Sequence, residues 1–153
     1  MVDRFTIAPG GRLDGTVTGQ PDDGDALSVR LTAAAAAQSL THVAAGTAAG
    51  SVSRNGARAV SYAGITSLVG LDFEATSAAD AIQVARGSAT GTIEVTSTNP
   101  IATFGRLTVA LTGRTAFGLD AGAGDDSVTI TASAGDAVLD GGEISIAGGE
   151  GTN

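Results

Sequence analysis

The sequence predicts an all-β fold, and three observations lead to that prediction. Short stretches alternate between apolar and polar residues and are bounded by Gly and Asp, which is typical of strands with one buried face. Glycine accounts for 23 of the 153 residues, which implies many tight turns. Aromatic residues make up only 3%, so the core must consist of small aliphatic side chains, which favour closely stacked strands.

Five stretches carry the alternation most clearly. In each of them Val, Ile or Leu alternates with Ser, Thr or a charged residue, and the Thr and Ser residues favour extended backbone. We expect strands at all five, which are 51–53, 92–96, 106–112, 127–131 and 143–146.

One stretch departs from this pattern. Residues 31–40 contain five consecutive alanines, and alanine has the highest helix propensity. The sequence leaves two alternatives open here: a short helix that caps or decorates the fold, or a strand whose alanines pack flat against a neighbouring layer.

Two phrases recur in the same order along the chain. An aspartate followed by alternating aliphatic residues begins at Asp25, Asp80 and Asp126, with spacings of 55 and 46 residues, and the phrase at 46–52 returns at 87–93. These repeats predict two degenerate copies of a unit of roughly 40 to 55 residues, which could bury its apolar face only by stacking. We therefore expect residues 1–153 to form a single region with the fold of a parallel β-helix or β-roll-like solenoid. A Greek-key β-sandwich is the alternative, although its core usually contains larger residues.

The charge and the residue types exclude several classes of function. The net charge is −8, without any Lys, and such a chain repels phosphate backbones, so no nucleic-acid partner is expected. The absence of Cys excludes disulfides, thiolate catalysis and Cys-based zinc sites. No apolar stretch approaches the roughly 18 residues of a membrane-spanning helix, and none is expected.

The strongest chemical motif is residues 121–129, AGAGDDSVT. It matches the nonapeptide G-G-x-G-x-D-x-U-x except for Ala121 at the first position. Gly122 and Gly124 permit a sharp turn that exposes backbone carbonyls, and Asp126 supplies carboxylate oxygen, with Asp125 beside it. Several oxygens at a tight turn suit Ca²⁺, which takes six to eight oxygen ligands.

This motif resembles the turns of the RTX, or hemolysin-type calcium-binding, family of secreted bacterial proteins. It also resembles very long bacterial surface proteins in which degenerate turns alternate with a V-x-Y-x-G-I-x-x-L phrase. That phrase occurs here at 60–68, and Asp80 with its strand follows it. The resemblance extends over about residues 10 to 153 and rests on short motifs. It implies a secreted or cell-surface location and a β-roll or parallel β-helix segment of an adhesive or scaffolding protein.

The sequence also departs from the RTX pattern. Those rolls share one calcium between turns about 18 residues apart, and Ile144 occupies the corresponding position. The next Gly-rich turn ends at Asn153, 27 residues after Asp126, a spacing that suits a wider coil. The chain stops there, so we expect it to be a fragment of a longer protein. The candidate calcium site consists of Gly122, Gly124, Asp125, Asp126 and Asn153, and a calcium-free Gly/Asp turn is the favoured interpretation of the motif.

No catalytic residues are predicted. His42 is the only histidine, no G-x-S-x-G elbow occurs, and the acidic run at 22–25 is typical of a plain turn. The sequence therefore favours a structural or adhesive module of a secreted or cell-surface protein, without enzymatic activity, that contacts cell-surface or matrix partners. A self-associating solenoid that stacks end to end into filaments is the first alternative. A polysaccharide-active β-helix enzyme is the second, and it requires carboxylates aligned beside basic residues.

Overall fold

All regular structure in the described part of the chain is β. The computed structural model describes residues 2–20, 24–67, 69–97, 104–110, 115–131 and 143–148, and these contain thirteen strands in two sheets. No helix in these ranges is long and apolar enough to cross a membrane. The all-β prediction is confirmed.

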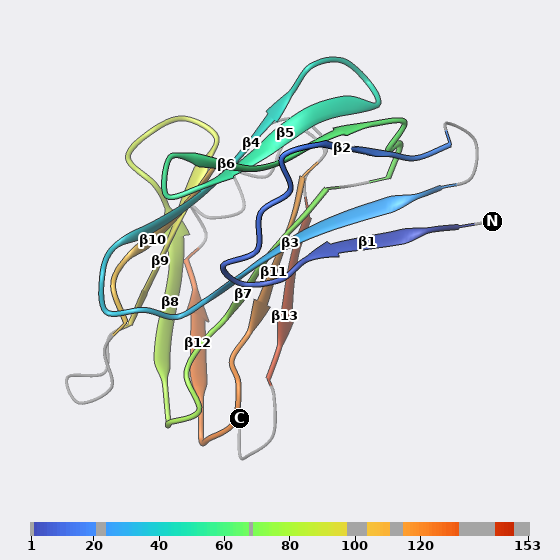
Figure 1. Ribbon diagram of the computed structural model, residues 1–153. Coiled ribbons are helices and arrows are strands. Elements are labelled where there is room, and N and C mark those ends of the chain that lie inside the picture. Colours follow the sequence, from blue (N-terminus) through green and yellow to red (C-terminus); the bar gives the residue numbers. More distant parts are fainter. Residues whose placement is uncertain are drawn as a thin grey trace.

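The first sheet, sheet A, is entirely parallel (Figure 1). Its spatial order follows the order in the chain, and each consecutive pair of its strands is separated in sequence by strands of the other sheet. A Greek-key sandwich consists of antiparallel strands, so this sheet does not have the pairing of that alternative. The strands of sheet A are β1 (Arg4–Ile7), β3 (Ala26–Thr32), β7 (Val69–Glu74), β11 (Thr115–Asp120) and β13 (Glu143–Ala147).

The second sheet, sheet B, has eight strands in the order β12-β8-β9-β10-β4-β5-β6-β2. Two antiparallel meanders, β4–β5–β6 and β8–β9–β10, are joined by a parallel pairing of β4 with β10. β2 and β12 add parallel strands at the two edges. The strands are β2 (Thr16–Thr18), β4 (Gln38–Ala44), β5 (Ala49–Arg54), β6 (Ala57–Ala63), β8 (Ala81–Arg86), β9 (Thr92–Ser97), β10 (Leu107–Ala110) and β12 (Ser127–Ile130). All five strands predicted from alternation are present.

The alternation in the sequence builds the core between the two sheets. In β3 and β7 every second residue is buried, because the side chains of a strand point alternately to its two faces. The buried residues of the two sheets form one hydrophobic cluster, which includes Leu27, Val29, Leu71, Phe73, Phe117 and Leu119 from sheet A and Leu40, Val52, Val60, Ile82, Val84, Ile93, Val95, Leu107 and Val109 from sheet B. Partly buried hydrophobic residues at the two ends of this cluster include Phe5, Ile7, Val128 and Ile144.

The five alanines form neither a helix nor a strand, so both alternatives are wrong for residues 33–37. Leu31 is the last buried residue of β3, which ends at Thr32, and β4 begins at Gln38. The alanine backbone instead forms hydrogen bonds with distant segments. Ala33 N donates to Glu74 O at 2.8 Å, and Gly105 N donates to Ala34 O at 2.7 Å. Pairing with neighbouring segments therefore overrides the helix propensity of alanine.

The recurring sequence phrases differ in how they are placed. Residues 46–52 and 87–93 lead into β5 and β9, the two strands of sheet B that run against the other six. Asp80 and Asp126 precede β8 and β12, which pair directly with a 46-residue offset. Asp25 precedes β3 in sheet A instead. The 46-residue spacing therefore relates structurally equivalent positions, Asp80 and Asp126, whereas the 55-residue spacing from Asp25 to Asp80 relates positions in different sheets.

Candidate functional site

Two equivalent connecting turns lie next to each other, one at residues 75–80 and one at residues 121–126. Each leads from a strand of sheet A to a strand of sheet B. The hydrogen bonding of the parallel strands continues into these turns, because Ala75 N donates to Asp120 O at 2.8 Å and Ser127 N donates to Asp80 O at 2.8 Å. The two turns are thus held together at both ends.

The glycines of the motif are required by this close contact. Gly122 and Gly124 have φ angles of 85° and 136°, a backbone conformation that favours glycine. A Cβ atom on Gly124 would lie 2.8 Å from the carbonyl oxygen of Ala78, and one on Gly122 would collide with the carbonyl oxygen of Thr76. Stacking of one turn on the next therefore explains both glycines without any bound ion.

Asp126 links the two turns through its side chain. The backbone N–H of Asp80 donates to Asp126 Oδ1 at 2.7 Å, and both aspartates are buried. Asp80 in turn closes its own loop, because its Oδ2 accepts hydrogen bonds from Thr76 N at 2.9 Å and Thr76 Oγ1 at 2.7 Å. Each of these carboxylates thus satisfies backbone groups that a tight turn would otherwise bury unpaired.

One oxygen of each carboxylate remains for a ligand. Asp80 Oδ1 and Asp126 Oδ2 are buried and accept no hydrogen bond. Asp125 is exposed, although it neighbours the buried Asp126, and Asn153 lies outside the described residues. Within the described ranges no three acidic or histidine side chains gather closely enough to hold a metal ion. A cation bound to either free oxygen would need backbone carbonyls or water for the rest of its shell.

Asp25 plays the same role at another turn. The backbone N–H groups of Asp3 and Gln20 donate to its two oxygens, each at 2.7 Å, and its side chain is buried. These hydrogen bonds, first that from Asp3 and then that from Gln20, lower the pKa of Asp25 below its ordinary value. The carboxylate therefore belongs to the structure of the turn, in agreement with the reading of 22–25 as a plain turn. Asp22 and Asp23 lie outside the described residues.

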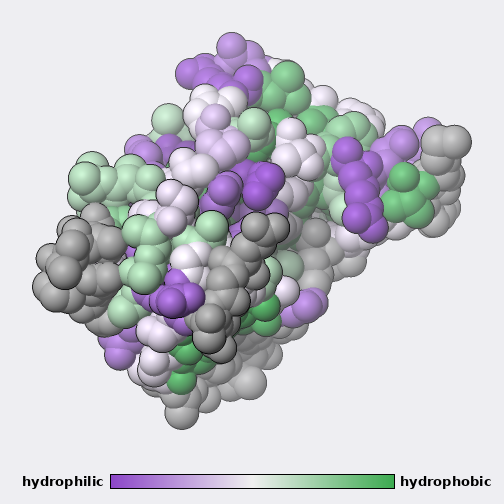
Figure 2. Space-filling view, turned by 90° about the horizontal axis from the view of Figure 1, so that it is seen from below, coloured by the Kyte–Doolittle hydropathy of each residue, from purple (hydrophilic) through white to green (hydrophobic). Residues whose placement is uncertain are grey.

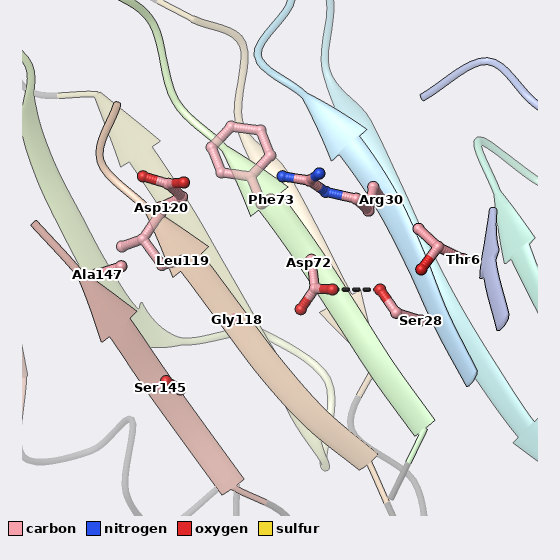
Figure 3. A pocket seen from close by; sticks show the side chains of 10 residues that line it. All are labelled: Thr6, Ser28, Arg30, Asp72, Phe73, Gly118, Leu119, Asp120, Ser145 and Ala147. Atoms are coloured by element: carbon pink, nitrogen blue, oxygen red, sulfur yellow. Dashed lines mark hydrogen bonds between the residues drawn. The ribbon is translucent and has the colours of Figure 1, made fainter. Parts of the chain in front are cut away.

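A second candidate site is a shallow groove on the outer face of sheet A. It has a volume of about 350 Å³ and crosses several neighbouring strands (Figure 3). Arg30, Asp72 and Asp120 provide its charged groups, from β3, β7 and β11. Gly118 forms part of its floor, and Asp72 Oδ1 occupies the space that a Cβ atom on Gly118 would need.

The charged groups of the groove already have partners within the chain. Ser28 Oγ donates to Asp72 Oδ2, the dashed contact in Figure 3. Arg30 lies 3.7 Å from Glu74, with both side chains a little under half exposed, and Asp120 Oδ1 accepts from Gly122 N at 3.1 Å. A polar ligand could compete for these contacts, but none of them depends on one.

Sequence reasoning did not identify this alignment of carboxylates, although a signal for it was available. The 46-residue offset that relates Asp80 to Asp126 also relates Glu74 to Asp120 and Asp72 to Gly118, and these are register partners of β7 and β11. Applying the 46-residue offset to β7, the strand before Asp80, would have placed Asp72, Glu74 and Asp120 on one face of the sheet.

His42 lies in the core. It is 1% exposed, with Nδ1 at 2.9 Å from Thr115 Oγ1 and Nε2 at 2.6 Å from Tyr62 Oη. Its ring stacks on that of Tyr62, with ring centroids 5.8 Å apart. Because Thr115 belongs to sheet A and the other two residues to sheet B, this group ties the sheets together. A histidine enclosed in this way has no access to a substrate.

The surface adds no dominant apolar site on the side that Figure 2 shows. Hydrophobic residues lie there in separate groups among hydrophilic ones. The large hydrophobic side chains that are exposed in the described ranges are spread over the chain, at Val2, Leu13, Val43, Ile130 and Ile146. Comparison of the chain with protein-family models, curated proteins and solved structures found no match.

Proposed function

We propose that this chain is a β-solenoid repeat module with a structural or adhesive role in a secreted or cell-surface protein. The observation that carries the proposal is the contact between Asp126 Oδ1 and the backbone N–H of Asp80, by which one turn fixes the next. The parallel order of sheet A, which follows the chain, supports the same view. In a solenoid each repeat contacts its neighbours, and stability comes from those contacts.

The chemistry of the polar groups supports a role without catalysis. Asp25, Asp80 and Asp126 are buried and bind backbone N–H groups, and His42 is enclosed by two hydroxyls. These four residues therefore help to hold turns and sheets together.

Single-molecule force spectroscopy tests this function directly. The chain is pulled from its two ends, alongside Asp126→Ala and the exposed-site variant Asp125→Ala. A load-bearing module resists extension, and Asp126→Ala lowers the unfolding force while Asp125→Ala leaves it close to the original value. A chain that extends like an unfolded polypeptide, with no resolved unfolding event, would contradict a structural role.

Calcium binding is proposed as a property of the stacked turns. The free oxygens Asp80 Oδ1 and Asp126 Oδ2 support it, because a buried, unpaired carboxylate oxygen is costly unless a proton, a donor or a cation satisfies it. The Tm is measured with increasing Ca²⁺, with Mg²⁺ and EDTA as controls. A rise with Ca²⁺ that Asp126→Asn abolishes supports the site. If neither protein responds, the turns function without calcium.

A polysaccharide-active enzyme is the second candidate, favoured by the groove on sheet A. Asp72 and Asp120 line this groove together with Arg30, and a pair of carboxylates is what glycosidic-bond cleavage commonly uses. A screen of acidic polysaccharides with the chain and with Asp72→Asn tests this candidate. Product release that is lost in Asp72→Asn would support the enzyme and argue against a purely structural module.

A further inference from the structure

The two edges of sheet A are suited to each other. Among the described residues β1 pairs only with β3, and β13 pairs only with β11. All five strands run in the same direction, so the free edge of β13 and the free edge of β1 are also parallel. The edge β13 of one molecule could therefore receive β1 of another in the same parallel arrangement that builds the sheet.

The apolar residues at these edges lack one neighbour. One register position of sheet A contains Ile7, Val29, Leu71, Phe117 and Ile144. The three inner members are fully buried, whereas Ile7 and Ile144 at the ends are only partly buried. Ile146, the next residue of β13 on the same face as Ile144, is 36% exposed. Continuation of the register into a second molecule would place Ile144 against Ile7 and remove both from water.

The charges at the two edges are complementary. In the same register Glu143 lies opposite Thr6 of the second molecule, and Arg4 lies two residues before Thr6 on the same face of the strand. Both Arg4 and Glu143 are exposed. Charged side chains at such diagonal positions are within reach of each other across neighbouring strands.

The sheet already contains an ion pair with this offset. Arg30 has Asp72 as its register partner, yet it pairs with Glu74, two residues further along β7, at 3.7 Å. The contact between Arg4 of one molecule and Glu143 of another has the same two-residue offset on the same outer face of the sheet, with the arginine on the opposite side of the strand that carries the acid.

We propose that this chain associates head to tail with a second copy of itself, with β13 of one molecule adding in parallel to β1 of the next and Glu143 pairing with Arg4. The association goes beyond the proposed structural role and does not depend on the stacked turns. Because each copy has one edge of each kind, the association is open-ended and produces a series of oligomers.

Charge reversal at the two edges tests the interface. Sedimentation velocity over a range of concentrations compares the chain with Arg4→Glu, with Glu143→Arg, and with Arg106→Glu, an exposed arginine beside β10 in the middle of sheet B. Each edge variant sets like charges against each other, so we expect its association constant to fall about tenfold. The Arg106→Glu variant retains the original association. Circular dichroism verifies that every variant is folded.

Mixing the two edge variants separates a specific interface from general damage. In an equimolar mixture every contact between the two different variants again joins an acid to an arginine, so alternating association should recover, although each variant alone associates weakly. A chain that is monomeric at every soluble concentration would overturn the proposal. Association that stops at a closed dimer, or aggregation that all variants share, would overturn it as well.

Discussion

The carboxylate of Asp126 accepts a hydrogen bond from the backbone N–H of Asp80, at 2.7 Å, across two adjacent turns that are 46 residues apart in the sequence. Both residues are buried. Loss of this acceptor leaves a buried N–H group without a partner, and such a group costs considerably more than the bond itself contributes.

We therefore expect Asp126→Ala to lower the free energy of unfolding by about 1–3 kcal/mol. The neighbouring exposed residue provides a matched control, and Asp125→Ala should change the free energy by no more than about 0.5 kcal/mol. Urea unfolding followed by circular dichroism measures both. Equal losses in the two variants would mean that the contact between the turns contributes little.

Comparison of Gly122 with Gly10 separates the cost of backbone strain from the cost of a steric clash. Gly122 and Gly10 have φ angles of 85° and 74°, but only Gly122 has another turn against it, whereas nothing lies within 4 Å of a Cβ atom at Gly10. Gly10→Ala should cost about 1–2 kcal/mol through backbone strain. Gly122→Ala should cost at least about 1 kcal/mol more, because a packed neighbour must also move. Thermal and urea unfolding of the two variants test this order, which would be reversed or absent if the turns did not stack.

The stability of the chain should fall in acid partly because of Asp25. Its pKa is lower in the folded chain than its ordinary value, since Asp3 N–H and Gln20 N–H bind the charged form. The stabilisation is complete above the pKa of the unfolded chain and is lost as the pH falls through the lowered pKa of the folded chain. Urea midpoints between about pH 6 and about pH 2 should fall less steeply for Asp25→Asn than for the original chain. Parallel curves would show that this carboxylate does not contribute to acid sensitivity.

The buried hydroxyl beside His42 gives a further test of how the sheets are joined. Thr115→Val keeps the shape of the side chain but removes the oxygen that lies 2.9 Å from His42 Nδ1. We expect a loss of about 1–3 kcal/mol in the free energy of unfolding. Thr129→Val, the same substitution at an exposed strand position, should remain within about 0.5 kcal/mol. A similar result for both variants would exclude an energetic role of the histidine contact.

Local alternation in the sequence was sufficient to predict five of the thirteen strands in the described residues. The alternation at 127–131 and 143–146 gives β12 and β13 because burial of one face requires period two. The 46-residue spacing of Asp80 and Asp126 also predicted two related positions, which the structure pairs directly. The five alanines after Thr32 left a helix open as an alternative, because their propensity is local whereas the partners that bind their backbone, Glu74 and Gly105, are distant.

The remaining features depend on contacts that no short motif encodes. His42, Tyr62 and Thr115 come from three strands and meet only when the two sheets pack. Arg54 is buried and donates to Ala8 O at 2.9 Å, and burial lowers its pKa. Such residues are identified once the sheet topology is known, because only then is their position between the sheets defined.

The unequal strand counts of the two sheets affect the shape of any array that this chain forms. In the described residues sheet A has five strands and sheet B has eight, because the chain reversals at β5 and β9 add strands only to sheet B. At a strand spacing of about 4.8 Å, sheet B is about 14 Å wider. Each copy is therefore wider at sheet B than at sheet A. An array of copies joined edge to edge would curve, with sheet A on its concave side.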